Sequence, residues 1–168
     1  MANFLFDVST AFAIISPCGV YRYALTRLFT PEPKTSVNFL MLNPSKATAE
    51  ITDPTFTRCI DFAKNWRYDA VVLTNLFALR STDPRALKTH VDPIGPDNNG
   101  HLTSNAIASS LVVAAWGTKG YLFERDKKVL KMLAEAGVKV HRLAITKDGF
   151  PQHPLFVPKN VTPVEWER

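Results

Sequence analysis

An apolar run in the first third of the chain is closed abruptly by polar residues. Residues 37–45 read VNFLMLNPS, so that the apolar run leads directly into Asn43, Pro44 and Ser45. A continuous apolar run closed by a turn signal is typical of a strand buried on both faces. Pro44 cannot donate to a strand ladder, and it disfavours helical geometry at Asn43. We therefore predict that a strand ends here and presents Asn43 and Ser45 at its carboxyl end, where open α/β sheets bind ligands. An ordinary turn is the alternative interpretation.

Further apolar runs alternate along the chain with segments of helical periodicity. The apolar runs lie at residues 70–73, 110–116 and 138–145, and the helical periodicity lies at 54–66, 99–109 and 121–136. This alternation predicts an α/β fold, a three-layer sandwich with a mostly parallel central sheet. Asp53 is a plausible N-cap for the first of these helices, because Pro54 follows it at the first helical position.

The remaining segments are expected to form edges and loops of a single domain that covers residues 1–168. Residues 9–16 and 20–29 alternate with period two around a Pro-Cys-Gly turn signal, and we predict an N-terminal strand pair that extends the sheet edge. Residues 80–100 are rich in proline and glycine and carry only a short helical turn near 84–88. A connection of this length is more often functional than idle.

The composition argues against a membrane-spanning protein, a secreted protein and a cysteine-based metal site. The chain has 168 residues, 46% of them hydrophobic and 21% charged, and no apolar run approaches the roughly 20 residues that span a bilayer. Its start lacks a basic segment of the secretory type, and its two cysteines, Cys18 and Cys59, lie outside metal-ligand spacing. We expect a cytoplasmic monomer with buried free thiols, no cofactor and no metal site. The net charge of +5 is compatible with a polyanionic partner.

Several strands of the predicted sheet end in polar residues or in a turn. Asn43, Asn75 and Trp116 stand at or near such ends, and His153 lies in a proline-stiffened loop after the last strand. Because the carboxyl ends of parallel strands meet at one edge, these side chains and Asp53 are expected to share a cleft. Each also has a structural interpretation: Asn75 can cap a turn, His153 can lie on a surface loop, Asp53 can cap a helix and Trp116 can fill the core.

Motifs of several large enzyme classes are absent from the sequence. It contains no glycine-rich phosphate loop, no nucleophile elbow and no histidine pair at metal-binding spacing. This absence disfavours kinases, dinucleotide enzymes, metallohydrolases and serine hydrolases.

The polar motifs together resemble a family catalogued as domain of unknown function 1643, found in bacteria and phages. The resemblance covers about residues 10–156. The motifs that carry it are NPSKA at 43–47, DPT at 53–55, NLFALRSTDP at 75–84, AWG at 115–117 and DGFPQHPLF at 148–156.

The order of the strand ends also resembles, more distantly, the uracil-DNA glycosylase superfamily. The resemblance implies a glycosylase-like fold in which Asn43 positions the hydrolytic water and Asn75 reads the edge of the base. It implies that Trp116 belongs to a structural strand end and that His153 stabilises the departing base. Leu155, or Phe156 beside it, would be the wedge that enters the duplex.

The sequence departs from that superfamily at three places. Leu42 replaces residues that leave room at the water site, and the His-Pro-Leu loop at 153–155 lacks the Ser-Pro pair that contacts a DNA phosphate. The aromatic residue that stacks on the flipped base has no clear counterpart, and Phe56 and Phe77 are the candidates. Pro44 and Ser45 are expected to contact the substrate beside Asn43.

The functional hypothesis is a glycosylase-like hydrolase that cleaves the N-glycosidic bond of a modified or damaged base in DNA, or of a nucleotide. Asp53 is the candidate general base, because Asn43 orients water without deprotonating it. The alternatives are a non-catalytic nucleic-acid or nucleotide binding module and a nucleotide-processing enzyme of other chemistry. The residues available for phosphate contacts are Arg22, Arg27, Lys46, Arg80, Arg85, Lys119 and Lys147.

Overall fold

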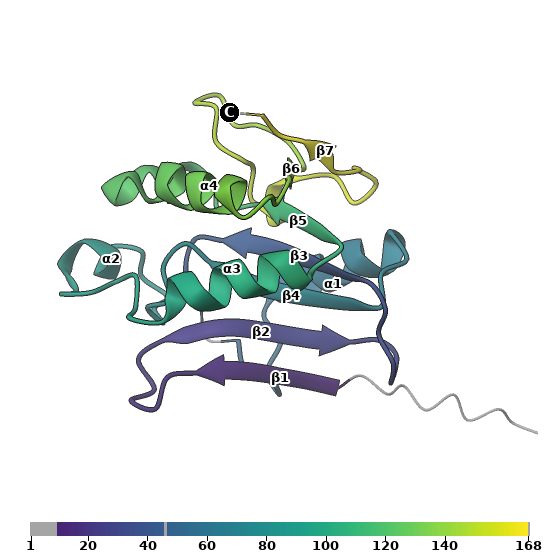
Figure 1. Cartoon of the computed structure of the whole chain (residues 1–168), viewed down its shortest axis with the longest axis horizontal. Helices are drawn as coiled ribbons and strands as arrows, with labels where there is room; N and C mark the ends of the chain where they lie inside the picture. The colour runs from purple at the N-terminus through teal and green to yellow at the C-terminus, as the bar shows by residue number, and fades with distance from the viewer. Residues whose placement is uncertain (1–9, 46, 168) are drawn as a thin grey trace, which may run out of the picture.

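The structure, a computed structural model, describes residues 10–45 and 47–167 and contains one mixed sheet with helices on both sides (Figure 1). Within the described residues the sheet has seven strands in the order β1-β2-β4-β3-β5-β6-β7. The strands are β1 (Thr10–Ile15), β2 (Arg22–Leu28), β3 (Ser36–Met41), β4 (Ala70–Asn75), β5 (Leu111–Ala114), β6 (Val140–Arg142) and β7 (Val164–Glu165). The α/β class predicted from the alternation of apolar runs and helical segments is confirmed.

The direction of the strands divides the sheet into a parallel centre and antiparallel margins. β4, β3, β5 and β6 pair in parallel, whereas β1 with β2, β2 with β4 and β6 with β7 pair antiparallel. The N-terminal strand pair extends one edge, as its alternating pattern predicted. The short strand β7 was not predicted, because residues 164–165 carry no periodic signal and pair only once the last connection has folded back.

Helices cover the two faces of the sheet in separate layers. The helices are α1 (Pro54–Asn65), α2 (Ala86–Thr89), α3 (Asn98–Ala108) and α4 (Arg125–Glu135), with 3-10 turns η1 (Thr118–Glu124) and η2 (Pro154–Phe156). The core on one face joins α1 through Phe56 and Phe62 to Phe39 of β3. The core on the other face joins α3 and α4, through Leu102 and Leu133, to the opposite side of the sheet. Successive side chains of a strand point to opposite faces of the sheet, so the same buried strands contribute residues to both cores.

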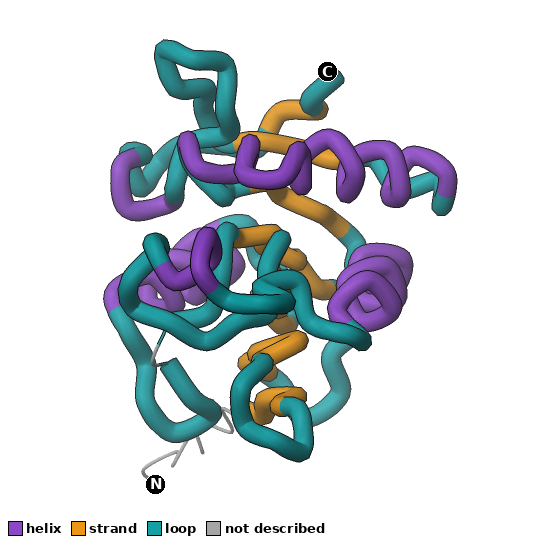
Figure 2. Tube along the Cα trace, turned by 90° about the vertical axis from the view of Figure 1, so that its left-hand side faces the viewer, coloured by secondary structure: helices purple, strands orange, loops and turns teal. Residues whose placement is uncertain are grey.

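Two successive connections place the next strands, β4 and β5, on opposite sides of the central strand β3, and this determines where a ligand can bind. The connection through α1 leads to β4 on one side of β3, and the connection through α3 then crosses to β5 on the other side. The carboxyl ends of these strands meet at the left-hand side of Figure 1, and Figure 2 views the molecule from that side. Such a change of direction opens a crevice at the carboxyl ends of the strands.

The helix predicted over residues 121–136 is two elements instead of one. Phe123 and Glu124 adopt left-handed backbone conformations, with φ of 55° and 53°, and these separate η1 from α4. The hydrophobic period does not reveal this kink, because apolar positions on both sides of it face the same core. A second correction concerns Cys18, which was expected to be buried and is exposed in the turn between β1 and β2.

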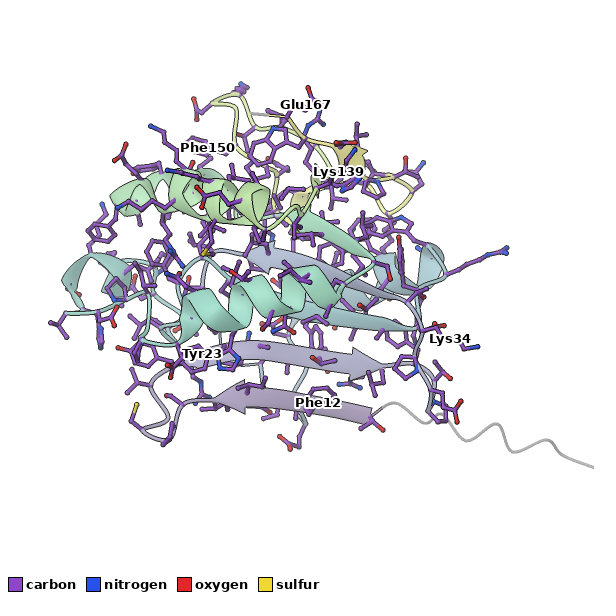
Figure 3. The ribbon with its side chains drawn as sticks, viewed as in Figure 1. Phe12, Tyr23, Lys34, Lys139, Phe150 and Glu167 are labelled. Carbon is purple, nitrogen blue, oxygen red and sulfur yellow. The ribbon has the colours of Figure 1, made fainter. Side chains whose placement is uncertain are left out.

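Buried polar side chains fasten the end of β4 to α3 and α4. Asn98 Nδ2 donates to the carbonyl oxygens of Asn75 (3.0 Å) and Leu76 (3.1 Å). Arg125 Nε donates to the same Leu76 carbonyl at 2.7 Å, and its Nη2 donates to Asn99 Oδ1 at 2.6 Å. On the same side of the sheet, Tyr23 of β2, which is labelled in Figure 3, stacks on His101 of α3 with ring centroids 4.7 Å apart. The hydrogen bonds of Asn98 and Arg125 hold the carboxyl end of β4 in place.

Replacing Asn98 by alanine should lower the free energy of unfolding by about 2 kcal/mol, because two buried carbonyl groups lose a hydrogen-bond donor. Urea denaturation followed by circular dichroism measures this change. Asn65→Ala, at an exposed position in the last turn of α1, is the matched control and should change stability by less than about 0.5 kcal/mol. Equal stability of the two variants would show that Asn98 does not fasten β4.

Candidate functional site

A cavity of about 280 Å³ opens at the carboxyl ends of β3, β4 and β5. It is lined by Arg22, Met41, Leu42, Asn43, Ser45, Asp53, Thr55, Leu73, Asn75, Ser81, Thr82, Trp116 and His153. The structure thus brings together Asn43, Asp53, Asn75 and His153, which lie far apart in the sequence and were predicted to share a cleft. Ser45 and Trp116 line the same cavity.

Asn43 connects the end of β3 to the loop that follows β4. Its Nδ2 donates to the Ser81 carbonyl oxygen at 2.9 Å and to that of Pro44 at 3.2 Å. The backbone N–H of Ser81 in turn donates to the Pro44 carbonyl oxygen at 3.0 Å. Because the amide nitrogen is engaged in this way, the oxygen of the Asn43 side chain is the group left to accept a hydrogen bond from a ligand or a water.

Asp53 begins α1 and also lies on the wall of the cavity. Its Oδ1 accepts a hydrogen bond from the Phe56 backbone N–H at 2.7 Å, which confirms the predicted N-cap. Its Oδ2 accepts a hydrogen bond from the Ser45 hydroxyl. Among the described residues that line the cavity, Asp53 is the one carboxylate. It therefore has both a structural role and a position from which its charge acts on a ligand.

Three buried hydrogen-bond donors line the cavity without an acceptor among the described residues. They are Nδ2 of Asn75, Nε1 of Trp116 and Nε of Arg22, and these residues are only 1%, 2% and 2% exposed. A buried donor without a partner destabilises the folded protein by about 1–3 kcal/mol, and such groups are rare in native proteins. Buried atoms without a partner in the described chain also occur elsewhere, for example on Asn38 and Arg142, but these three lie on residues of one cavity, where a ligand that supplies acceptors can pair with them.

Arg22 is the residue whose importance the sequence did not reveal. It was one of seven basic residues available for phosphate contacts, and only the fold shows that it is buried in the cavity wall. β2 runs antiparallel to β4, so the beginning of β2 lies at the same edge as the end of β4. Burial lowers the Arg22 pKa to about 10, although the negative charge of Asp53 acts in the opposite direction. A guanidinium with this pKa stays charged at neutral pH.

His153 is held in the cavity wall by a loop that is attached to the end of β5. The Gly117 backbone N–H donates to the Pro151 carbonyl oxygen, and the Gln152 backbone N–H donates to that of Ala144, both at 2.9 Å. Gly117 adopts a φ of 73°, which suits glycine where the chain turns beside the histidine.

The protonation of His153 follows from its contacts. Nδ1 accepts a hydrogen bond from the Leu155 backbone N–H at 3.2 Å, which assigns the proton of the neutral ring to Nε2. Burial lowers the His153 pKa, while the charge of Asp53 opposes this change. The imidazole is therefore a neutral donor at pH 7.

Two aromatic candidates for base stacking lie elsewhere. Phe56 and Phe77 are fully buried, in the cores on opposite faces of the sheet, and neither lines the cavity. The sequence around each ring predicts that the ring is buried, but it does not predict whether the ring faces the cavity or a core. Leu155 lines another hollow and is 37% exposed, and Phe156 beside it is 74% exposed, so both lie on the surface next to His153. Pro44, which was expected to contact the substrate, is not among the residues that line the cavity, and its carbonyl oxygen accepts hydrogen bonds from Asn43 and Ser81.

The other basic candidates are scattered. Arg80 lines a neighbouring cavity, and Arg85 is exposed and forms an ion pair with Asp83 at 2.9 Å. Lys119 and Lys147 are exposed and line neither cavity. The prediction for Lys46 lies outside the described residues.

In the part of the chain that the structure describes, no three His, Cys, Asp or Glu side chains are grouped so that they could hold a metal ion. No helix in residues 10–45 or 47–167 is long and apolar enough to cross a bilayer.

Comparison with known proteins gives one family. Residues 22–155 match the family described as protein of unknown function (DUF1643), and this match covers most of the chain. No curated protein and no solved structure matches the chain.

The His153 ring should titrate below the ordinary histidine value of about 6.5 and carry its proton on Nε2 when neutral. Because the unfolded chain then binds this proton first as the pH falls, His153 should reduce the free energy of unfolding as the pH drops below about 6.5. Long-range ¹H–¹⁵N NMR of the imidazoles, assigned with His153→Gln, measures both properties. A midpoint at or above 6.5 for this ring would contradict its burial in the cavity wall.

Proposed function

This protein belongs to the DUF1643 family, and we propose that it is a glycosylase-like hydrolase that cleaves the N-glycosidic bond of a modified or damaged base in DNA, or of a nucleotide. The observation that carries the proposal is the cavity that is lined by both the unpartnered amide of Asn75 and the neutral imidazole of His153. A base has the carbonyl and ring-nitrogen acceptors that these donors lack.

Recognition of the base is assigned to Asn75. Its side chain is buried at the carboxyl end of β4, and the Asn98 side chain holds the backbone beside it through the Asn75 carbonyl oxygen. A carboxamide offers one donor group and one acceptor group, which can pair with the edge of a pyrimidine in bidentate fashion. The unpartnered Nδ2 identifies the donor half of that pair.

Stabilisation of the leaving base is assigned to His153. Cleavage of an N-glycosidic bond leaves negative charge on the base while the sugar becomes oxocarbenium-like. The Nε2–H group of a neutral imidazole can donate to the developing anion, and such preorganised donors commonly supply the largest part of a rate enhancement. The guanidinium of Arg22 in the same wall adds positive charge to the site.

Positioning of the attacking water and stabilisation of the sugar are assigned to Asn43 and Asp53. The free side-chain oxygen of Asn43 can orient an attacking water, and the carboxylate of Asp53 can accept its proton or stabilise the positive charge on the sugar. Each Asp53 oxygen already accepts one hydrogen bond and retains a further lone pair.

The topology supports the resemblance to the uracil-DNA glycosylase superfamily. Asn43 follows the central strand β3, Asn75 ends β4, Trp116 follows β5 and His153 follows β6, which is the order that the resemblance implies. Among the described residues, Trp116 is the one aromatic ring other than His153 that lines the cavity. It replaces Phe56 and Phe77 as the candidate for an aromatic contact with the base.

A non-catalytic nucleotide-binding module is the second candidate, and one observation favours it. The amide nitrogen of Asn43 and both oxygens of Asp53 take part in local hydrogen bonds that hold the loops together. A site in which these groups are only structural would bind a base without activating water.

Incubation with duplex and single-stranded oligonucleotides and with nucleotides, each carrying modified bases, should release a base from at least one substrate. His153→Gln should lower the rate by about 100- to 1,000-fold, as the loss of one donor to a developing anion does in other enzymes, and Asn43→Ala should also lower it. Mass spectrometry of the released base measures the rate.

His101→Gln is the control for the histidine variant, because His101 stacks on Tyr23 and lines neither the cavity of Asn75 nor its neighbour. Binding without release from any substrate would favour the binding module. Release that survives both Asn43→Ala and His153→Gln would overturn the assignment of these roles.

Asn75→Asp should weaken binding of the preferred base by about 10- to 100-fold, because an acceptor replaces the donor and leaves the base acceptor unpaired. Calorimetric titration of the variant and the wild type gives the ratio. Asn65→Asp makes the same chemical change on the exposed end of α1 and should leave affinity unchanged. Equal losses in the two variants would mean that Asn75 does not contact the base.

A further inference from the structure

Arg22 forms fewer contacts than a buried arginine needs. One of its terminal nitrogens, Nη1, donates to the Ala47 carbonyl oxygen, and its Nε is buried without an acceptor among the described residues. No carboxylate in the described part of the chain forms an ion pair with it. A charge buried with so little compensation destabilises the folded protein strongly unless a counter-ion is supplied.

Arg125 shows what a structural arginine looks like in the same protein. It is 3% exposed, similar to Arg22, but its Nε donates to the Leu76 carbonyl oxygen and its Nη2 to Asn99 Oδ1. Burial lowers the pKa of both arginines to about 10. The difference is that Arg125 lies between packed elements, whereas Arg22 lines a cavity. The missing partner of Arg22 is therefore expected to come from whatever occupies that cavity.

A second cavity adjoins the first and brings another arginine to the same place. It has a volume of about 550 Å³ and is lined by Gly19, Val20, Ser45, Leu79, Arg80, Ser81, Thr82 and His90. Ser45, Ser81 and Thr82 line both cavities and mark their junction. The hydroxyl groups of Ser45 and Ser81 already donate to Asp53 Oδ2 and to the Asp83 carbonyl oxygen. Arg80 Nη1 donates to the Gly19 carbonyl oxygen at 3.0 Å, and its Nε is buried and unpartnered among the described residues.

The two arginines act on each other electrostatically. Burial is the larger cause of the lowered Arg22 pKa, and the positive charge of Arg80 lowers it further. The negative charge of Asp53 raises the Arg22 pKa by more than Arg80 lowers it, so burial is the cause that keeps this pKa below its ordinary value. Two guanidinium groups in adjoining cavities, each with an Nε donor that lacks an acceptor among the described residues, form a site suited to an anion with several acceptor oxygens.

We infer that the junction of the two cavities binds a phosphate group between Arg22 and Arg80, so that the ligand is a nucleotide and not a free base or nucleoside. The inference rests on the proposed function, which places the base of the same ligand in the first cavity beside Asn75. The phosphate comes either from a mononucleotide or from a strand, and both present the same oxygens to the guanidinium groups. Alone, the first cavity is at the lower end of the range for small-molecule sites, about 300–1,000 Å³, and with its neighbour it falls within that range.

The test is calorimetric titration of the full chain with nucleosides, the matching 5′-monophosphates, inorganic phosphate and short single-stranded oligonucleotides. The monophosphate should bind about 10- to 100-fold more tightly than its nucleoside, as expected for charge-assisted hydrogen bonds. Arg80→Gln should reduce this ratio to about 1. Arg22→Lys keeps the charge but removes the planar Nε donor, and it should reduce the ratio at least tenfold.

Controls separate the phosphate site from folding and from base recognition. Arg67→Gln removes the same charge from an exposed position just before β4, at the opposite edge of the sheet, and should leave the ratio unchanged. Asn75→Asp should weaken nucleoside and monophosphate alike. If Arg22→Lys does not fold, Arg80→Gln decides the question, because Arg80 is not part of either apolar core.

The outcomes distinguish a mononucleotide from a strand as the source of the phosphate. They also separate failure of the phosphate site from failure of the proposed hydrolase. Tight binding of monophosphates supports a free nucleotide, and tight binding of oligonucleotides alone, weakened by Arg80→Gln, supports a strand. Binding of inorganic phosphate that depends on Arg80, without base release from any substrate, supports the phosphate site and overturns the hydrolase. The phosphate site is overturned if none of these probes binds, if the ratio is unchanged in Arg80→Gln, or if the wild-type ratio is about 1 and Arg80→Gln does not weaken oligonucleotide binding.

Discussion

The hydrogen bonds between the end of β3 and the loop after β4 are the contacts on which the site depends. Asn43 donates to the Ser81 carbonyl oxygen, and the Ser81 N–H donates to that of Pro44. Further along, the N–H groups of Leu76 and Phe77 donate to the carbonyl oxygens of Met41 and Leu42 at 2.8 and 2.9 Å. The chain beyond β4 therefore continues beside the end of β3. Its residues Ser81 and Thr82 line both cavities.

Polar groups around this edge fall into two classes. Asn98 and Arg125 are buried, and their hydrogen bonds hold the backbone at the end of β4. Asn75 and Arg22 are equally buried but keep donors without a partner among the described residues, and both line the cavity. Because unpaired buried donors are costly, this contrast supports the proposal that Asn75 and Arg22 pair with a ligand. Both the base site and the phosphate site rest on this distinction.

Much of the fold and part of the site could be predicted from local chemistry. The apolar runs located the central strands, the Asp-Pro pair located the start of α1, and the alternating N-terminal segments predicted the edge pair. The convergence of Asn43, Asn75 and His153 followed from one rule, that parallel strands present their carboxyl ends at one edge. The kink at Phe123 and the strand β7 escaped prediction, because both depend on where distant segments come to lie.

The sequence by itself determined which apolar segments form the buried strands and where these strands end, because apolar periodicity and proline act within a few neighbouring residues. Only the tertiary structure decided which buried residues face the cavity. Phe56 and Phe77 are as apolar as a stacking ring requires, yet they point into opposite cores. Arg22 lies in an ordinary alternating strand, and it reaches the site because β2 runs antiparallel to β4. Strand direction is set by contacts between distant segments, so no local pattern contains it.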